Sequence, residues 1–252
     1  MTSMVKLVKH PNHIELVLNR PESLNALSTP MLKEMAAALL EAEAGPGTVM
    51  VMRGEGRAFC VGADIKERQK GMSLETYLME RVLTFQKITS VLRGTEKIII
   101  AALHGHVVGG GLIMSLYADL RIAAAGTSFR LPEVDVGSTV LGGGYKVLAD
   151  CVGLSMTKEL LLLGEAVTSE RAERSGLINF TVAPDELNVV VDRYVEKLSA
   201  KNPVALKLIK RAAARTTDTG FEEMQLREII DACLNHYAAS GKANDVSPGQ
   251  LR

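Results

Sequence analysis

Short apolar runs alternate with amphipathic stretches along most of the chain. Six of these runs predict strands: Val5–Val8, His13–Leu18, Thr48–Arg53, Ile98–Leu103, Leu120–Ala124 and Leu177–Val182. Ile98–Leu103 is apolar throughout, which is typical of a strand buried on both faces. Strands that alternate with helices favour an α/β fold with parallel strand pairing.

The amphipathic stretches between these runs predict the helices. The first of them opens at Thr29 and Pro30, which we assign as its N-cap and first helical residue. The predicted helices cover residues 30–43, 76–92, 112–118, 156–163, 169–175 and 185–199. A long polar helix is predicted from Pro203 to about Ala239, followed by a disordered tail at 241–252. The helical last third indicates an appendage or an assembly surface.

Composition excludes several classes of protein. The 252 residues are 47% hydrophobic, enough for a sizeable core, and 29 Lys and Arg balance 29 Asp and Glu. A net charge of zero gives no basic field for nucleic acid or an anionic membrane. The three cysteines are widely spaced, without a CxxC motif, which fits a reducing compartment. With no signal-like N-terminus and no long apolar run, we expect a cytoplasmic protein without membrane or nucleic-acid partners.

Two glycine-containing loops are the first candidates for chemistry. Arg57–Ile65 and Gly105–Leu112 each follow an apolar strand and each open a helix. Consecutive glycines let another group approach the backbone, and a helix N-terminus gathers unpaired N–H donors. Two such turns side by side could each offer one N–H to an oxyanion. A tight turn under a packed helix explains the glycines equally well, and neither loop is a dinucleotide or P-loop fingerprint.

Glu133 is the main candidate for acid–base chemistry. It lies in a mostly apolar stretch before the second glycine cluster, and apolar surroundings raise the pKa of a carboxyl group. A solvated loop charge is the competing interpretation, and we expect Asp135 to be exposed. His104 and His106 fit structural roles, because no metal-ligand spacing involves them. No metal site is predicted.

A nucleophilic mechanism is not supported by the sequence. Ser115 lacks the GxSxG turn of a serine hydrolase. Cys60 follows a strand, where a cysteine is more often a small buried hydrophobe than a nucleophile.

Taken together, several segments resemble one family in order and spacing. They are LNRPESLNALS (18–28), RAFCVGADIKE (57–67), IAALHGHVVGGGLIMSLYADLRIAA (100–124), SFRLPEVDVG (128–137), GEAVTSERAERSGLINFTV (164–182) and NPVALKLIKRA (202–212). The chain is identified as a member of the enoyl-CoA hydratase/isomerase (crotonase) superfamily, and the resemblance covers roughly residues 5–235.

The resemblance implies an α/β, crotonase-like (ClpP/crotonase) spiral of ββα units over residues 1–195. It also implies a C-terminal helical trimerisation region over residues 196–252, which builds a homotrimer or hexamer. The substrate would be an acyl-CoA thioester, and no cofactor is expected beyond the coenzyme A carried by the substrate.

The resemblance also implies roles for individual residues. Ala63 and Gly110 match the two oxyanion-hole N–H donors, and Glu133 matches a catalytic glutamate. Residues that match the substrate-binding segments are Asn25, Ala26, Ala63, Asp64, Ile65, Lys66, Gly109, Gly110 and Ile113. Lys207 or Lys210 could reach a coenzyme A phosphate.

Departures from the family pattern bear on the reaction. Hydratases of the family use two glutamates, and the first of these positions is Ile113 here, whereas Glu133 is kept. The loop that usually reads Pro-Gly-x-Gly-Gly is Val140–Gly144, without its proline. An apolar side chain cannot position or deprotonate a water molecule.

The sequence therefore predicts a single-glutamate enoyl-CoA isomerase, which moves a proton through a thioester enolate. The alternatives are an enoyl-CoA hydratase, and a decarboxylase or biosynthetic member that acts on a CoA or carrier-protein thioester. A non-catalytic acyl-CoA-binding or RNA-binding relative is the alternative from another class.

Overall fold

The computed structural model describes residues 3–68 and 78–215. They belong to two units divided after Ser199. The predicted boundary after residue 195 lies inside helix α8 (Leu187–Ser199).

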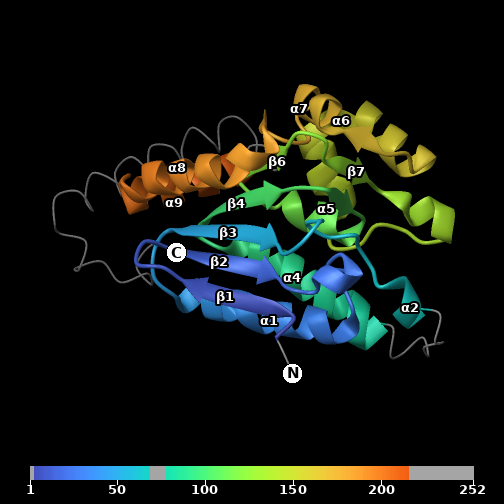
Figure 1. Ribbon diagram of the computed structural model, residues 1–252, viewed down its shortest axis with the longest axis horizontal. Coiled ribbons are helices and arrows are strands. Elements are labelled where there is room, and N and C mark those ends of the chain that lie inside the picture. The colour runs from blue at the N-terminus through green and yellow to red at the C-terminus, as the bar shows by residue number, and fades with distance from the viewer. Residues whose placement is uncertain (1–2, 69–77, 216–252) are drawn as a thin grey trace. The chain divides into compact units, whose positions relative to one another are not determined.

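A six-stranded sheet forms the centre of the first unit. Its order is β1-β2-β3-β4-β6-β9, and the first four arrows can be followed side by side in Figure 1. In this sheet only β1 and β2 pair antiparallel, as a hairpin that turns at residues 10–12, and every other pair is parallel, as predicted. The strands are β1 (Val5–Lys9), β2 (His13–Leu18), β3 (Val49–Gly54), β4 (Ile98–Leu103), β6 (Leu120–Ala124) and β9 (Phe180–Val182).

Both faces of this sheet are covered by helices. On β3, Val49 and Val51 belong to the apolar cluster that includes α8. Met50 and Met52 point to the opposite face, in the cluster with α1 (Thr29–Ala44) and α4 (Leu83–Gly94). All six residues of β4 are buried, as its apolar sequence predicts. Helices on both faces are typical of parallel sheets, whose strands lose their polar alternation.

A second, three-stranded sheet was not predicted. It consists of β5 (His106–Val108), β7 (Ser128–Arg130) and β8 (Val167–Thr168), with β5 parallel to β7. β5 leads directly into Gly109, and β7 leads into the 3-10 helix η3 (Pro132–Val136), which carries Glu133. The small sheet therefore brings the glycine turn and the glutamate together.

Several helix boundaries differ from the prediction. Thr29 is not the N-cap of α1: Ser28 is, and its hydroxyl accepts the Met31 N–H at 3.4 Å. α5 (Gly110–Ser115) begins at the second glycine of the GGG turn. α6 (Gly144–Leu163) consists of two helical segments that meet at a kink at Gly153 (φ 72°, ψ 165°), and the prediction from residue 156 covers only the second of them. The strand predicted from Leu177 begins only at Phe180.

The remaining elements are short or belong to the second unit. In the first unit they are η1 (Pro21–Ser23), α2 (Ile65–Arg68), the π-helix η2 (Leu78–Val82), α7 (Ser169–Arg174) and η4 (Pro184–Glu186). The second unit contains α9 (Pro203–Arg215). Residues 76–77 of one predicted helix, the helix predicted beyond 215 and the predicted tail lie outside the described residues.

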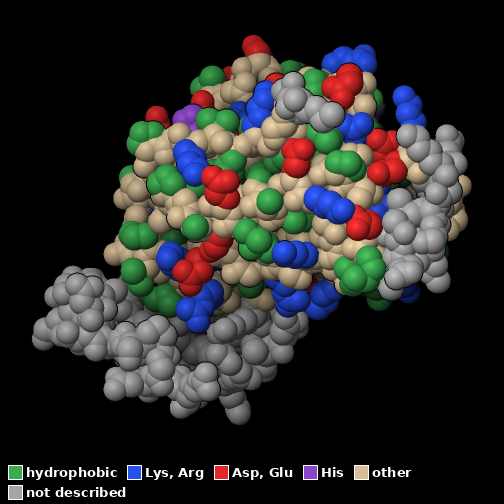
Figure 2. All heavy atoms as spheres, turned by 90° about the horizontal axis from the view of Figure 1, so that it is seen from below, with side chains coloured by type: hydrophobic (Ala, Val, Ile, Leu, Met, Phe, Trp, Pro, Cys, Tyr) green, Lys and Arg blue, Asp and Glu red, His purple; other side chains and the backbone are tan. Residues whose placement is uncertain are grey.

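The surface carries no segregated charge on the face that Figure 2 shows. Acidic and basic side chains are interspersed over its coloured part. Within the described residues, no helix combines the length and the apolar character needed to cross a membrane.

Candidate functional site

The two glycine-containing loops lie side by side, which is the arrangement that the oxyanion-hole hypothesis requires. The Phe59 N–H donates to His104 O at 2.9 Å, and the Cys60 N–H donates to His106 O at 3.1 Å. The Val108 N–H returns a bond to Cys60 O at 2.9 Å. These bonds extend the parallel pairing beyond the ends of the strands, so both loops leave the sheet at the same edge.

Glycine is required where the two backbones meet. A Cβ on Gly62, which has φ +80°, would lie 2.9 Å from Val108 O. A Cβ on Gly111 would lie 2.6 Å from the Cβ of Cys60. Both distances are shorter than side-chain packing allows. The residues that follow Gly62 and Gly109 are Ala63 and Gly110, the two predicted oxyanion-hole donors.

The amides of Ala63 and Gly110 are available as donors. Leu27 bridges the chain on both sides of Ala63: its N–H donates to Gly62 O (2.8 Å), and its carbonyl accepts the Asp64 N–H (3.1 Å). In this parallel pattern the N–H of Ala63 points away from Leu27. Gly110 is the first residue of α5, where a helix leaves its N–H groups unpaired. Neither amide has an acceptor within residues 3–68 and 78–215.

These two residues line a cavity of about 540 Å³, a size that accommodates a small acyl group. Much of its wall is apolar, from Leu27, Leu32, Phe85, Ile113 and Leu141. Its polar side chains come from Asp64, Arg81, Glu133, Ser138 and Thr139. An apolar cavity with a few polar groups suits a ligand that is mainly hydrocarbon around one reactive group.

Glu133 is the carboxylate at this cavity that has no ion pair with another described residue. Its Oε2 is buried and has no hydrogen-bond partner among the described residues. Burial raises the pKa of the Glu133 carboxyl group above its ordinary value. Asp64, the other acidic residue of the wall, is bound by Arg20 at 3.1 Å. A carboxylate with a raised pKa and a free oxygen suits general acid–base chemistry.

Ile113 presents an apolar surface to the same cavity. Its side chain is 1% exposed, and a Cβ on Gly144 would lie 2.8 Å from its Cδ1. The altered glycine loop packs against it at Gly144, and the Tyr117 hydroxyl donates to Gly142 O in the same loop. The position where the sequence pattern of the hydratases has its first glutamate is therefore occupied by a buried apolar side chain.

Not every predicted substrate-binding residue lines the cavity. Asn25 is fully buried in the scaffold: its Oδ1 accepts the Arg20 N–H (2.8 Å), and its Nδ2 donates to Glu55 O (2.9 Å) and Ala58 O (2.8 Å). The neighbouring Ala26 is also buried, and its carbonyl accepts from Arg20 at 2.6 Å.

The other predicted contacts lie outside the wall. Ile65 and Lys66 are exposed and do not line the cavity, and Gly109 lies behind it against Glu133. Lys207 and Lys210 belong to the second unit, so their predicted phosphate contact stays a prediction.

The two nucleophile candidates that the sequence analysis considered, Cys60 and Ser115, are buried and hydrogen-bonded. The Cys60 thiol is buried and donates to Asn25 O at 3.1 Å, and burial raises its pKa to about 12. The Ser115 hydroxyl is buried and donates to Leu112 O at 2.7 Å. His104 has a structural bond, between its Nε2 and Gly56 O at 3.0 Å.

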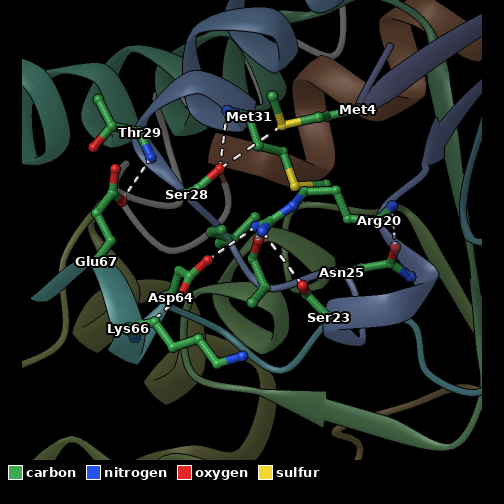
Figure 3. Close-up of polar contacts among 12 residues, drawn as sticks. Met4, Arg20, Ser23, Asn25, Ser28, Thr29, Met31, Asp64, Lys66 and Glu67 are labelled. Carbon is green, nitrogen blue, oxygen red and sulfur yellow. Dashed lines mark hydrogen bonds and ion pairs between the residues drawn. The ribbon is translucent and has the colours of Figure 1, made fainter. Parts of the chain in front are cut away.

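Sequence patterns missed the charged residues that brace the site. Arg20 binds Asp64, and Glu67 accepts the Thr29 N–H at 2.8 Å (Figure 3). Arg81 lines the cavity and contacts Leu27, Thr29 and Glu67. These residues have no characteristic spacing, because their partners are 14 to 54 positions away in the sequence.

Comparison with known proteins identifies the family. A family model described as enoyl-CoA hydratase/isomerase matches residues 11–244. The short-chain-enoyl-CoA hydratase of Clostridium acetobutylicum is 34% identical over 202 residues, which are 79% of this chain and 77% of that protein. The crotonyl-CoA hydratase of Syntrophomonas wolfei is 33% identical over 209 residues, 82% and 80% of the two chains.

Solved structures share the whole fold. The enoyl-CoA hydratase from Bacillus anthracis has a TM-score of 0.86 at 28% identity, covering 91% of this chain and 89% of that one. The enoyl-CoA hydratase from Thermoplasma volcanium also has a TM-score of 0.86 at 28% identity, covering 97% and 96%. The predicted α/β, crotonase-like fold is thereby confirmed. The chain belongs to the enoyl-CoA hydratase/isomerase family.

Proposed function

We propose that this protein isomerises a 3-enoyl-CoA thioester to the 2-enoyl-CoA thioester. Glu133 removes a proton from C2, and the electron pair moves onto the thioester oxygen to give a dienolate. Glu133 then returns the proton to C4, and the double bond moves from C3–C4 to C2–C3. No water is consumed, and the base is regenerated in its charged form.

The observation that carries this proposal is the contrast between Glu133 and Ile113 across one cavity. The carboxylate of Glu133 has a buried, unpartnered oxygen, whereas Ile113 offers only carbon. One base suffices for a proton shift between two carbons, because the same group gives and takes the proton. Hydration also needs a group that orients the water.

The amides of Ala63 and Gly110 would supply the second part of the catalysis. One preorganised hole donor contributes about 3–4 kcal/mol to the stabilisation of an oxyanion. A positioned base contributes ~10²–10⁴-fold in rate. Together these effects suit the removal of an allylic proton that the thioester already acidifies.

Hydration of a 2-enoyl-CoA thioester is the second candidate. The Clostridium and Syntrophomonas relatives are named hydratases, and Ser138 and Thr139 place hydroxyl groups in the cavity wall. A hydratase reaction here would need such a group in place of the glutamate absent at Ile113. A decarboxylase would need the oxyanion hole but not Glu133.

The test is an assay of purified protein with matched 3-enoyl-CoA and 2-enoyl-CoA substrates. We expect conversion of the 3-enoyl thioester and a loss of ~10²-fold or more in Glu133→Gln. Asp135→Asn is the matched control, because Asp135 lies on the same short helix but is exposed and paired with Arg130 at 2.8 Å. Robust hydration of the 2-enoyl thioester by the native protein would overturn the isomerase proposal.

A further inference from the structure

The carbonyl of Leu27 accepts two hydrogen bonds at the edge of the proposed oxyanion hole. One comes from the Asp64 N–H at 3.1 Å, and the other comes from Arg81 Nη2 at 2.9 Å. The first bond holds the loop that contains Ala63. The second joins this loop, through one shared oxygen, to a cation on the π-helix η2.

Arg81 also holds the chain beyond Ala63. Its Nη1 contacts Thr29 Oγ1 at 3.2 Å and forms an ion pair with Glu67. Glu67 lies on α2, which starts two residues after Ala63, and its Oε2 also accepts the Thr29 N–H at 2.8 Å (Figure 3). The guanidinium group therefore ties the segment 27–29, which pairs with the Ala63 loop, to α2, which follows that loop.

The geometry of the guanidinium group is suited to this role. Two nitrogens of one rigid plane contact three residues in two segments of the chain, which a lysine ammonium cannot reproduce. The Arg81 side chain is 14% exposed, so water competes weakly for these bonds. Arg20 forms a separate ion pair with Asp64 on the same loop. This ion pair still holds the loop when Arg81 is lost.

We propose that Arg81 is a positioning residue, which fixes the direction of the Ala63 N–H in the oxyanion hole. The inference rests on the proposed function, because it gives a catalytic purpose to a network that would otherwise only stabilise the fold. Misplacement of a catalytic donor by about 1 Å can cost ~10²-fold in rate, even when the protein stays folded. Loss of Arg81 therefore weakens oxyanion stabilisation more than it weakens thioester binding.

The test measures how strongly the oxyanion hole stabilises a bound enolate, in the absence of turnover. Acetoacetyl-CoA is a β-keto thioester that ionises to an enolate with its own ultraviolet absorbance, so its bound pKa can be read by titration. We expect the native protein to lower this pKa relative to free acetoacetyl-CoA. In Arg81→Met and Arg81→Lys, we expect the bound enolate to be about tenfold less favoured, which is one pKa unit. The dissociation constant of coenzyme A should change less than about threefold.

Arg53→Met is the matched control. Arg53 is 17% exposed and contacts Glu15 (3.0 Å) and Asp192 (3.2 Å), but it does not line the cavity. We expect it to lower thermal stability as Arg81→Met does and to leave the pKa of bound acetoacetyl-CoA unchanged. Glu67→Gln is a milder second variant, which keeps an acceptor for Thr29 but removes the charge that holds Arg81. It should shift the enolate in the same direction by a smaller amount.

The outcomes separate the two proposals. An unchanged enolate pKa in Arg81→Met, or an equal shift in Arg53→Met, would overturn the positioning role. Retention of the native value in Arg81→Lys would assign the effect to charge alone and would also overturn it. If the native protein itself fails to lower the pKa of acetoacetyl-CoA, the oxyanion hole is absent and the proposed function fails.

Discussion

The carboxylate of Glu133 lies directly against the backbone of Gly109. A Cβ on this glycine would be 3.1 Å from Glu133 Oε1. The Gly109 N–H also donates to Arg130 O at 2.9 Å, on the strand that leads to Glu133. One short strand pair therefore sets the distance between the proposed base and the neighbouring amide of Gly110.

The pH dependence of isomerisation should report the ionisation of Glu133. Burial raises the pKa of its carboxyl group, and only the charged form accepts a proton. We expect kcat/KM to rise with pH through an inflection above 4.5, the ordinary value for glutamate. A pH–rate profile measures this, with Asp135→Asn expected to show the same curve. An inflection at the value of an exposed glutamate would contradict the assignment.

Glu133 should also lower the stability of the fold at neutral pH. Above its raised pKa the folded protein carries the cost of a desolvated charge that the unfolded chain does not. Below the ordinary value of 4.5 the carboxyl is protonated in both states, and the cost disappears. We therefore expect Glu133→Gln to melt at a higher temperature than the native protein at neutral pH and at an equal temperature in acid. Calorimetry at both pH values tests this, and a lower Tm for the variant at neutral pH would contradict it.

Ile113→Glu should introduce hydratase activity at a cost in stability. The new carboxylate would face Glu133 across the cavity, where it could orient a water molecule. We expect hydration of 2-enoyl-CoA to rise ~10-fold or more relative to isomerisation. Because Ile113 is 1% exposed, the free energy of unfolding should fall by about 2 kcal/mol.

Ile113→Gln separates charge from shape in this experiment. It has nearly the same size as the glutamate variant and no base, so its hydration rate should stay at the native level. Equal hydration rates in the two variants would show that a missing carboxylate does not limit the native protein.

Asn25 should contribute to stability rather than to substrate binding. Asn25→Gly keeps the left-handed backbone (φ 56°) but removes the amide that pairs with the Arg20 N–H, Glu55 O and Ala58 O. We expect a loss of about 2–3 kcal/mol in urea unfolding and a KM within about twofold of native. A large rise in KM without a loss of stability would instead support the substrate contact that the family resemblance implies.

Much of the six-stranded sheet could be predicted because the hydrophobic pattern of its strands agrees with their burial in the fold. The runs ending at Leu18, Arg53 and Leu103 are long and apolar enough to form strands in almost any context. β5, β7 and β8 have two or three residues each, too few to show a period. They form because β7 pairs with both β5 and β8 and because Val107 of β5 bridges to Cys60, and no local pattern reveals these partners.

The sequence by itself determined which groups are available: glycines at the loop crossing, Glu133 as a carboxylate, and carbon at Ile113. Residue type fixes this chemistry, whatever the fold. Tertiary structure alone decided that the Glu133 carboxylate is buried and that the Asn25 side chain hydrogen-bonds to the backbone. It also decided that Arg81 donates to the carbonyl of Leu27. Each of these depends on burial or on contacts between residues distant in the chain, and both arise only when the two glycine loops and the helices around them pack together.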